Sequence, residues 1–284
     1  MELKVLSEPT TKKRRVINAW PKDIKELKGL TSLEIRLRGL TSLDRRLGRL
    51  GIIPPTIGEL TNLRSLKIYG QEFLNPLPPE IGKLTGLKSL IIKDRKLREI
   101  PGEIGLLSNL TSLVIECEGL ESFPIRDNFD LSNLRLLKFT IGRLNKGLDI
   151  WAHIIGKLTK LEILEFVSND AAYVGQLAHP EKLIRKLVIP DSIGQLADLE
   201  ELTIWSNLEE LPETLNQLLC LRKIEIHNRY DSEPKINFNF AKLTKLKTIL
   251  IYPKHKDEYI RGLPYPFVTS RTLQTIGAWK RKNL

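Results

Sequence analysis

The sequence predicts an α/β solenoid shaped like a horseshoe, with a parallel β-sheet on its concave side and short helices or 3₁₀ turns on its convex side. Two repeated patterns and the composition lead to this prediction. The pattern LxxLxL recurs along nearly the whole chain, and a block similar to PxxIGxL precedes most of its copies. Hydrophobic residues make up 41% and charged residues 28% of the 284 residues, which favours a folded, water-soluble chain.

The spacing of LxxLxL, in which Ile or Phe sometimes replaces Leu, sets the length of the repeating unit. Successive copies begin 33, 24, 23, 24, 27, 38, 22 and 25 residues apart, so the basic unit is about 23 to 25 residues, which is typical of a solenoid repeat. Two longer intervals predict insertions near 36–52 and 167–183, and we expect one domain over 1–284 with about nine or ten repeats. The clear copies begin at Leu30, Leu63, Leu87, Leu110, Leu134, Leu161, Leu199, Leu221 and Leu246.

Both ends of the array carry weaker copies of the same pattern. Leu273 and Ile276 match a degenerate last copy of LxxLxL, and Leu3 and Leu6 match a degenerate first copy. A solenoid needs its terminal repeats covered, because an open end exposes the core. We therefore expect both ends to be closed by ordinary repeats that have become irregular.

The sequence of each repeating unit predicts one strand and one short helix or 3₁₀ turn. The end of LxxLxL alternates with a period of two, as in Leu66-Lys67-Ile68, and this period predicts a short strand. In the other block, Pro at the first helical position costs no hydrogen bond, and the acidic residue or Thr beside it suits a positive helix end. Short helices or 3₁₀ turns are therefore predicted after Pro21, Pro54, Pro78, Pro101, Pro190 and Pro212.

One further match to the strand pattern does not fit the spacing. Residues 184–189 match LxxLxL but leave too few residues for a complete unit before Leu199. The interpretation is an insertion with its own extra strand.

Together the two patterns read LPxxIGxLxxLxxLxI, and with this motif the chain resembles the leucine-rich-repeat superfamily. More narrowly, it is similar to intracellular Ras-pathway scaffold repeats and to the repeat domains of plant nucleotide-binding immune receptors. The resemblance implies a protein-binding scaffold or receptor in signal transduction or defence. The family usually places Asn three residues after the last strand position, and only Asn169 and Asn207 keep this rule here. We therefore expect uneven curvature and some turns open to solvent.

The residues between the apolar strand positions point away from the core and form the concave surface, where the family usually binds. Basic residues gather in its N-terminal half and glutamates follow toward the C-terminal half, so charge and aromatic anchors together suit a protein partner. The alternative is that outward strand positions are polar in any sheet and that aromatics favour strands. The candidate binding residues are Arg36, Arg64, Lys67, Tyr69, Lys88, Lys93, Glu165, Glu201, Trp205, His227 and Tyr252.

Signatures of catalysis and of cofactor binding are absent from the sequence. It contains no GxxxxGK[ST], GxGxxG, HExxH or CxxC motif, and its four histidines lie far apart. Cys117 and Cys220 are too few for a disulfide framework or a zinc site, and we expect both to be small apolar fillers. The sequence therefore predicts no enzyme, no cofactor and no metal site.

The formal net charge of +11 supports a second hypothesis. A polyanion, either nucleic acid or an inositol phosphate, would bind the basic N-terminal half of the concave face through Arg36, Arg64, Lys67, Lys88 and Lys93. Aromatic residues are only 6% of the chain, which disfavours nucleic acid.

Cysteine use and the lack of an apolar leader or a membrane-spanning stretch predict a cytoplasmic protein with no membrane partner. The basic run at 12–15 gives nuclear import as an alternative.

Overall fold

The computed structural model describes residues 2–6, 15–17, 24–37, 53–70, 76–120, 129–141, 154–168, 186–227, 235–237, 239, 242–252 and 275–276. The predicted insertions lie almost wholly outside these residues, as do Asn169, most of the basic run at 12–15 and three of the four histidines. The chain divides into two compact units, residues 1–150 and 151–284, and each is described by itself. The single domain stays a prediction.

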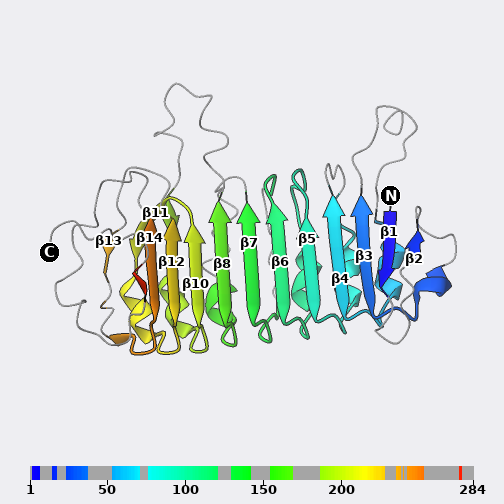
Figure 1. Cartoon of the computed structure of the whole chain (residues 1–284). Helices are drawn as coiled ribbons and strands as arrows, with labels where there is room; N and C mark the ends of the chain where they lie inside the picture. The colour runs from blue at the N-terminus through cyan, green and yellow to red at the C-terminus, as the bar shows by residue number, and fades with distance from the viewer. Residues whose placement is uncertain are drawn as a thin grey trace, which may run out of the picture. The chain divides into compact units, whose positions relative to one another are not determined.

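Unit 1 contains one sheet whose strands follow the order β7-β6-β5-β4-β3-β1-β2 (Figure 1). The strands from β3 to β7 are parallel and each pairs with the next repeat. The strands are β1 (Glu2–Leu6), β2 (Arg15–Ile17), β3 (Ser32–Leu37), β4 (Ser65–Gly70), β5 (Ser89–Lys93), β6 (Ser112–Cys117) and β7 (Leu136–Ile141).

Unit 2 has parallel strands in the order β15-β14-β12-β10-β8, together with a second sheet of three strands, β13-β11-β9. The first set comprises β8 (Ile163–Ser168), β10 (Glu201–Trp205), β12 (Lys223–His227), β14 (Thr248–Tyr252) and β15 (Thr275–Ile276). The second comprises β9 (Leu187–Val188), β11 (Leu208–Leu211) and β13 (Lys235–Ile236).

All nine clear copies of LxxLxL form strands, which confirms this part of the prediction. Each of these strands begins two residues after the first leucine of its copy. The register joins equivalent positions, so that Leu66 on β4 pairs with Leu33 on β3 and with Leu90 on β5. These side chains are fully buried, and together they form a continuous apolar ladder.

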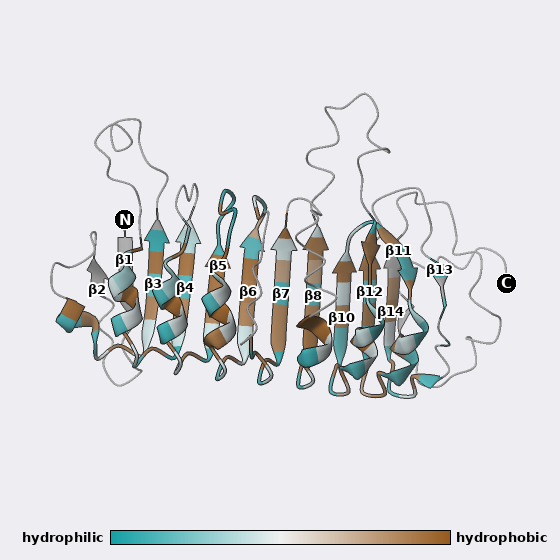
Figure 2. Cartoon of the chain, turned by 180° about the vertical axis from the view of Figure 1, so that it is seen from behind, coloured by the Kyte–Doolittle hydropathy of each residue, from teal (hydrophilic) through white to brown (hydrophobic). Residues whose placement is uncertain are grey.

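The six proline blocks all form 3₁₀ turns, which confirms the second pattern. In Figure 2 these turns lie over one face of the strands, and the apolar residues of both the turns and the ladder are buried. A seventh turn, η6 (Ile155–Lys157), forms without a proline. The six are η1 (Ile24–Leu27), η2 (Pro55–Glu59), η3 (Pro79–Lys83), η4 (Gly102–Leu106), η8 (Asp191–Gln195) and η9 (Glu213–Gln217).

The glycine of the IGxL block sets how closely successive 3₁₀ turns stack. A Cβ atom added at Gly82 would lie 2.6 Å from the backbone oxygen of Glu103 in the next turn. Gly58 has the same relation to Glu80, also at 2.6 Å. Real Cβ atoms do not approach so closely, so the stacking of η2 on η3 and of η3 on η4 needs glycine at these two positions.

The N-terminal prediction was wrong. The segment with Leu3 and Leu6 is not a worn parallel repeat, because β1 pairs antiparallel with β3, with Leu3 opposite Ile35. On its other edge β1 pairs antiparallel with β2. A strand shows the same alternation in either direction, so the sequence pattern did not distinguish the two arrangements. The C-terminal prediction is confirmed in the backbone, since Ile276 pairs in parallel with Ile249.

The extra strand predicted within 184–189 exists, but it is not part of an insertion. It is β9, which pairs with β11 in the second sheet, and both strands end just before a proline block. Because β11 occupies the same place one repeat later, this strand is a regular element of the repeat in unit 2.

Two buried polar side chains, Asp94 and Asn207, lie in the turns that follow strands. The Asp94 Oδ1 atom accepts hydrogen bonds from the backbone N–H groups of Lys96 and Leu97, at 2.7 and 2.9 Å. Asp94 is buried and stands one residue before Arg95, where the ladder asparagine was expected. Asp94 thus satisfies backbone N–H groups in this turn, the role expected of the ladder asparagine. Asn207 is buried as the ladder rule requires, although its Oδ1 accepts no hydrogen bond from the residues described.

Before the strands, a second set of asparagines links neighbouring repeats. The side-chain N–H of Asn109 donates to the Thr85 carbonyl at 2.9 Å, and Asn133 donates to Ser108 in the same way. Asn62 makes the equivalent bond to Lys28 at 2.7 Å. These bonds satisfy backbone oxygens at the ends of the 3₁₀ turns.

Candidate functional site

The candidate site is the open face of each sheet, meaning the face that carries the strand positions between the apolar ladder residues. Strand alternation places these side chains on the side opposite the 3₁₀ turns. The middle outward positions are Glu34, Lys67, Ile91, Val114 and Lys138 in unit 1, and Glu165, Thr203, Glu225 and Leu250 in unit 2. The last outward positions are Arg36, Tyr69, Lys93, Glu116, Thr140, Val167, Trp205, His227 and Tyr252.

Arg36 and Tyr69 lie next to each other at the N-terminal end of the open face of unit 1. The Arg36 guanidinium contacts the Glu34 carboxylate, with 2.5 Å between Nε and Oε1. Its Cζ atom also lies 5.3 Å from the centre of the Tyr69 ring, which is a cation–π geometry. Arg36 therefore already has both a carboxylate and an aromatic partner within the face.

Lys93, another predicted cation of this face, is paired as well. Its Nζ atom lies 2.7 Å from Oε2 of Glu116, and both side chains are about two-fifths exposed. An exposed pair of this kind contributes roughly 0–1 kcal/mol to stability. Its main effect on recognition is that two of the five predicted cations, Lys93 and Arg36, are offset by carboxylates on the same face.

Arg64 and Lys88 lie outside the outward columns, at the point where β4 and β5 begin. Both are exposed. The Arg64 Nη1 atom donates to the carbonyl oxygens of Leu63 and Gly86, each at 3.3 Å. The structure therefore places these two cations along the edge of the open face, in the same row, while Lys67 stands on the face itself.

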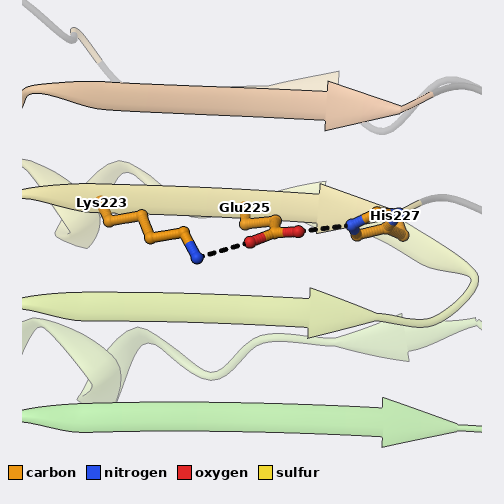
Figure 3. Close-up of polar contacts among 3 residues, drawn as sticks. All are labelled: Lys223, Glu225 and His227. Carbon is orange, nitrogen blue, oxygen red and sulfur yellow. Dashed lines mark hydrogen bonds and ion pairs between the residues drawn. The ribbon is translucent and has the colours of Figure 1, made fainter. Parts of the chain in front are cut away.

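In unit 2, three side chains of β12 form a continuous polar chain along the strand (Figure 3). The Lys223 Nζ atom lies 2.6 Å from Oε2 of Glu225, and His227 Nε2 lies 2.8 Å from Oε1 of the same carboxylate. Because an ionised carboxylate only accepts hydrogen bonds, the Nε2–H group of His227 is the donor. Glu225 thereby fixes the orientation of the His227 ring.

The oriented imidazole stacks on Trp205 of the neighbouring strand. The ring centres are 3.8 Å apart and the planes are inclined by 28°. The two residues are register partners on β10 and β12, and both are partly exposed. The stack therefore presents a fixed aromatic surface on the open face of unit 2.

Carboxylates surround Lys223 on this face. Its pKa is raised, first by the hydrogen bond to Glu225 and further by the charges of Glu201 and Glu165. Burial works against the ionised form of Glu225, but the hydrogen bonds from His227 and Lys223 outweigh it and lower the pKa of this carboxyl. Both shifts favour the charged forms of Lys223 and Glu225, so the ion pair between them persists at neutral pH.

The structure brings some predicted residues together and separates others. Trp205 and His227 are in direct contact, and Glu165 and Glu201 lie near the same lysine, whereas Arg64 and Lys88 stand at the edge. The backbone of Tyr252 lies in β14, but its side chain is outside the described residues. The sequence argument missed Lys223, which occupies the first outward position of β12, although it included Glu201, the register partner of Lys223 on β10.

The two cysteines differ in how far they are buried. Cys117 is fully buried, and burial raises the pKa of its thiol to about 12, which confirms it as an apolar filler. Cys220 is partly exposed, with its sulfur 3.5 Å from the Lys245 Nζ atom, so it is not a core filler. Within the described part of the chain, no group of three or more His, Cys, Asp or Glu side chains could hold a metal ion.

The ladder, the 3₁₀ turns and the open face together define a leucine-rich-repeat fold, and comparison with solved structures agrees. A leucine-rich-repeat protein of Leptospira interrogans is 25% identical with a TM-score of 0.56, covering 83% of this chain and 58% of that one. The leucine-rich-repeat domain of the type III effector XopL is 22% identical with a TM-score of 0.50, covering 83% and 81%. This chain therefore spans less than two thirds of the Leptospira protein.

Sequence comparisons add no narrower relationship. No protein-family model and no curated protein matches the sequence. Among the described residues, no helix is long and apolar enough to cross a membrane.

Proposed function

We propose that this protein is a non-enzymatic recognition module that binds a protein partner through the open face of its sheet. The observation that carries the proposal is the Trp205–His227 stack. Its rings are 3.8 Å apart, partly exposed, and held by the Glu225–Lys223 chain. A pre-oriented aromatic surface loses little conformational entropy on binding, and aromatic residues dominate the energetics of protein interfaces.

The wider biological role belongs to the same proposal. The role is that of a cytoplasmic scaffold or receptor in signalling or defence. It is supported by the narrower resemblance of the repeat motif to those of intracellular scaffolds and immune receptors. The repeated backbone supports it in a second way, because it offers many outward positions that can vary without altering the core.

The test compares partner capture by the wild-type protein with capture by a Trp205→Ala/His227→Ala variant. Loss of a central aromatic anchor should reduce the recovered partner at least tenfold, in line with a hot spot of about 2 kcal/mol or more. Val188→Ala is a matched control, because Val188 is 54% exposed and lies on the second sheet. Equal recovery by the aromatic variant and the control would contradict the proposal.

The polyanion hypothesis remains the second candidate, and the pairing of charges weakens it. Arg36 and Lys93 are bound to Glu34 and Glu116, so a polyanion crossing this face would meet two carboxylates. Binding through the remaining cations would fall steeply with salt because counterions are released. Affinity for heparin that hardly changes between about 0.05 and 0.15 M NaCl would exclude this candidate.

A further inference from the structure

The orientation of the aromatic stack in unit 2 depends on one carboxylate. Glu225 stands at the middle outward position of β12, and its Oε1 atom lies 2.8 Å from His227 Nε2. Alternate residues of a strand share a face, so this contact runs along β12 and holds the imidazole beside Trp205 on β10 (Figure 3). Whatever fixes the Glu225 carboxylate therefore also fixes the stack.

Unit 1 contains a similar arrangement, but its carboxylate is fixed differently. Glu34 contacts Arg36, two residues further along β3, and Arg36 lies over the aromatic ring of its register partner on β4. Glu34 is buried, whereas Glu225 is only partly buried. The first outward position is Ser32 on β3 and Lys223 on β12. The less enclosed of the two carboxylates is thus the one that follows a lysine on its own strand.

Lys223 makes the second contact of Glu225. Its Nζ atom lies 2.6 Å from Oε2, which is the oxygen that His227 does not use. Thr203 and Leu250, the register partners of Glu225 on β10 and β14, carry no charge. Among the described residues, the carboxylate is therefore held at one oxygen by the lysine and at the other by the imidazole.

Charge keeps Lys223 at this place. The hydrogen bond to Glu225 is the main cause that raises the pKa of Lys223, and the charge of Glu201, its register partner on β10, adds to it. Burial opposes ionisation of Glu225, and hydrogen bonds from His227 and Lys223 outweigh it to lower the pKa of this carboxyl. Without the lysine, Glu225 would lose the donor at one oxygen and the cation that separates its charge from that of Glu201. The carboxylate would then be freer to turn, and the imidazole would lose its fixed acceptor.

We propose that Lys223 is a positioning residue for recognition by the open face of unit 2, because it anchors the Glu225 carboxylate that holds the His227 ring on Trp205. The lysine acts through two hydrogen bonds along one strand and not through contact with the partner. The inference rests on the proposed function for the importance of the stack to a partner. The positioning itself is a property of the protein alone.

The test measures the stack in the full chain without a partner. Near-UV circular dichroism reports the fixed surroundings of aromatic rings. Subtracting the spectrum of the Trp205→Phe counterpart of each protein isolates the contribution of Trp205. Lys223→Met removes the charge but keeps a long unbranched side chain, and it should reduce this contribution by about twofold at neutral pH. Lys223→Arg supplies a charged donor again and should restore most of it.

Arg222→Met is the matched control. Arg222 is the residue before β12, is exposed, and lies 3.6 Å from Glu200 at the edge of the face. The substitution therefore removes the same charge beside the same strand without touching the contacts of Glu225, and it should leave the Trp205 contribution unchanged. Lys223→Met/Glu225→Gln should reduce the contribution no further than Glu225→Gln alone, because both changes act through one contact. Far-UV circular dichroism checks that each variant folds.

Three results would overturn the inference. The first is a Trp205 contribution that is the same in Lys223→Met and in wild type. The second is an equal loss in Lys223→Met and Arg222→Met, which would assign the effect to net charge. The third is a loss that Lys223→Arg does not restore, which would assign it to packing of the lysine stem.

The proposed function is tested separately by partner capture. If the Trp205→Ala/His227→Ala variant captures the partner like wild type, the proposed function fails, while the near-UV signal still decides the role of Lys223. If capture needs the stack, Lys223→Met should weaken capture and Lys223→Arg should restore it.

Discussion

The open faces of the two units differ sharply although the same repeat builds both. In unit 1 the outward and edge positions of β4 to β7 carry six cations and one carboxylate, namely Arg64, Lys67, Lys88, Lys93, Arg135 and Lys138 with Glu116. In unit 2 the corresponding positions carry Glu165, Glu201 and Glu225 around a single lysine, with an aromatic stack beside them. Edge positions differ too, since Glu200 in unit 2 pairs with Arg222 at 3.6 Å.

The buried side of the two units is nearly identical by contrast. Leu90 in unit 1 and Leu202 in unit 2 occupy the same ladder position and are both fully buried. The inward residues therefore determine the fold, and the outward residues are free to determine what each face attracts. This separation is the physical reason why one fold can present a basic face and an acidic face within one chain.

The strongest test of this separation is truncation of the ladder. Leu90→Ala and Leu202→Ala each remove a fully buried side chain, and each should lower the free energy of unfolding by about 2–5 kcal/mol. Urea unfolding followed by circular dichroism measures the loss. A large loss at one position and almost none at the other would show that the buried sides of the units are not equivalent.

A smaller loss is expected where the 3₁₀ turns stack. Gly82→Ala would place a Cβ atom 2.6 Å from the Glu103 backbone oxygen, and relieving this overlap should cost about 1–3 kcal/mol. Gly29→Ala is the matched control, because a Cβ there meets nothing within 4 Å. If both substitutions change the urea midpoint equally, the stacking argument fails.

The ladder and the turns could be predicted from the sequence because their signals are periodic. The position of Leu66 recurs as Leu or Ile in all nine clear copies, and that of Pro78 recurs in six blocks, so each copy supports the others. The direction of β1 could not be predicted, since Leu3 and Leu6 alternate in the same way in a parallel or an antiparallel strand.

The candidate site was predictable only in part. Periodicity identified which residues face outward, including Trp205 and His227. It did not indicate that Arg36 and Lys93 would be paired, because those contacts depend on side-chain conformations between neighbouring strands. The turn residue Asp94 was missed for a related reason, since a shift of one residue after a strand leaves the repeat spacing unchanged.

The charge difference between the faces can be sharpened by removing one carboxylate from unit 1. Glu116→Gln removes the carboxylate that lies 2.7 Å from Lys93, and it should slightly lower the free energy of unfolding. An exposed pair contributes about 0.2–1 kcal/mol, so the loss should lie within this range. Urea unfolding at about 0.15 M NaCl measures the change, and a loss clearly above about 1 kcal/mol would contradict the view that this pair is a weak, exposed one.

The smallest expected effect concerns the acidic face of unit 2. Burial opposes ionisation of Glu225, but hydrogen bonds from His227 and Lys223 prevail and hold its pKa below the usual value. A lowered pKa in the folded state means that the ionised carboxylate favours folding. Its contribution is fully present above the unfolded-state pKa, near 4.3, and disappears as the pH falls through the folded-state pKa.

Glu225→Gln should therefore reduce the free energy of unfolding by about 0.2–1 kcal/mol at pH 7, and the difference from wild type should shrink as the pH falls below about 4. Urea titrations at a series of pH values measure this difference. Glu209→Gln on the exposed side of β11 is the matched control. A Glu225→Gln deficit that stays constant down to about pH 3 would show that its cause is lost packing, and that the ionised chain of β12 does not stabilise the acidic face.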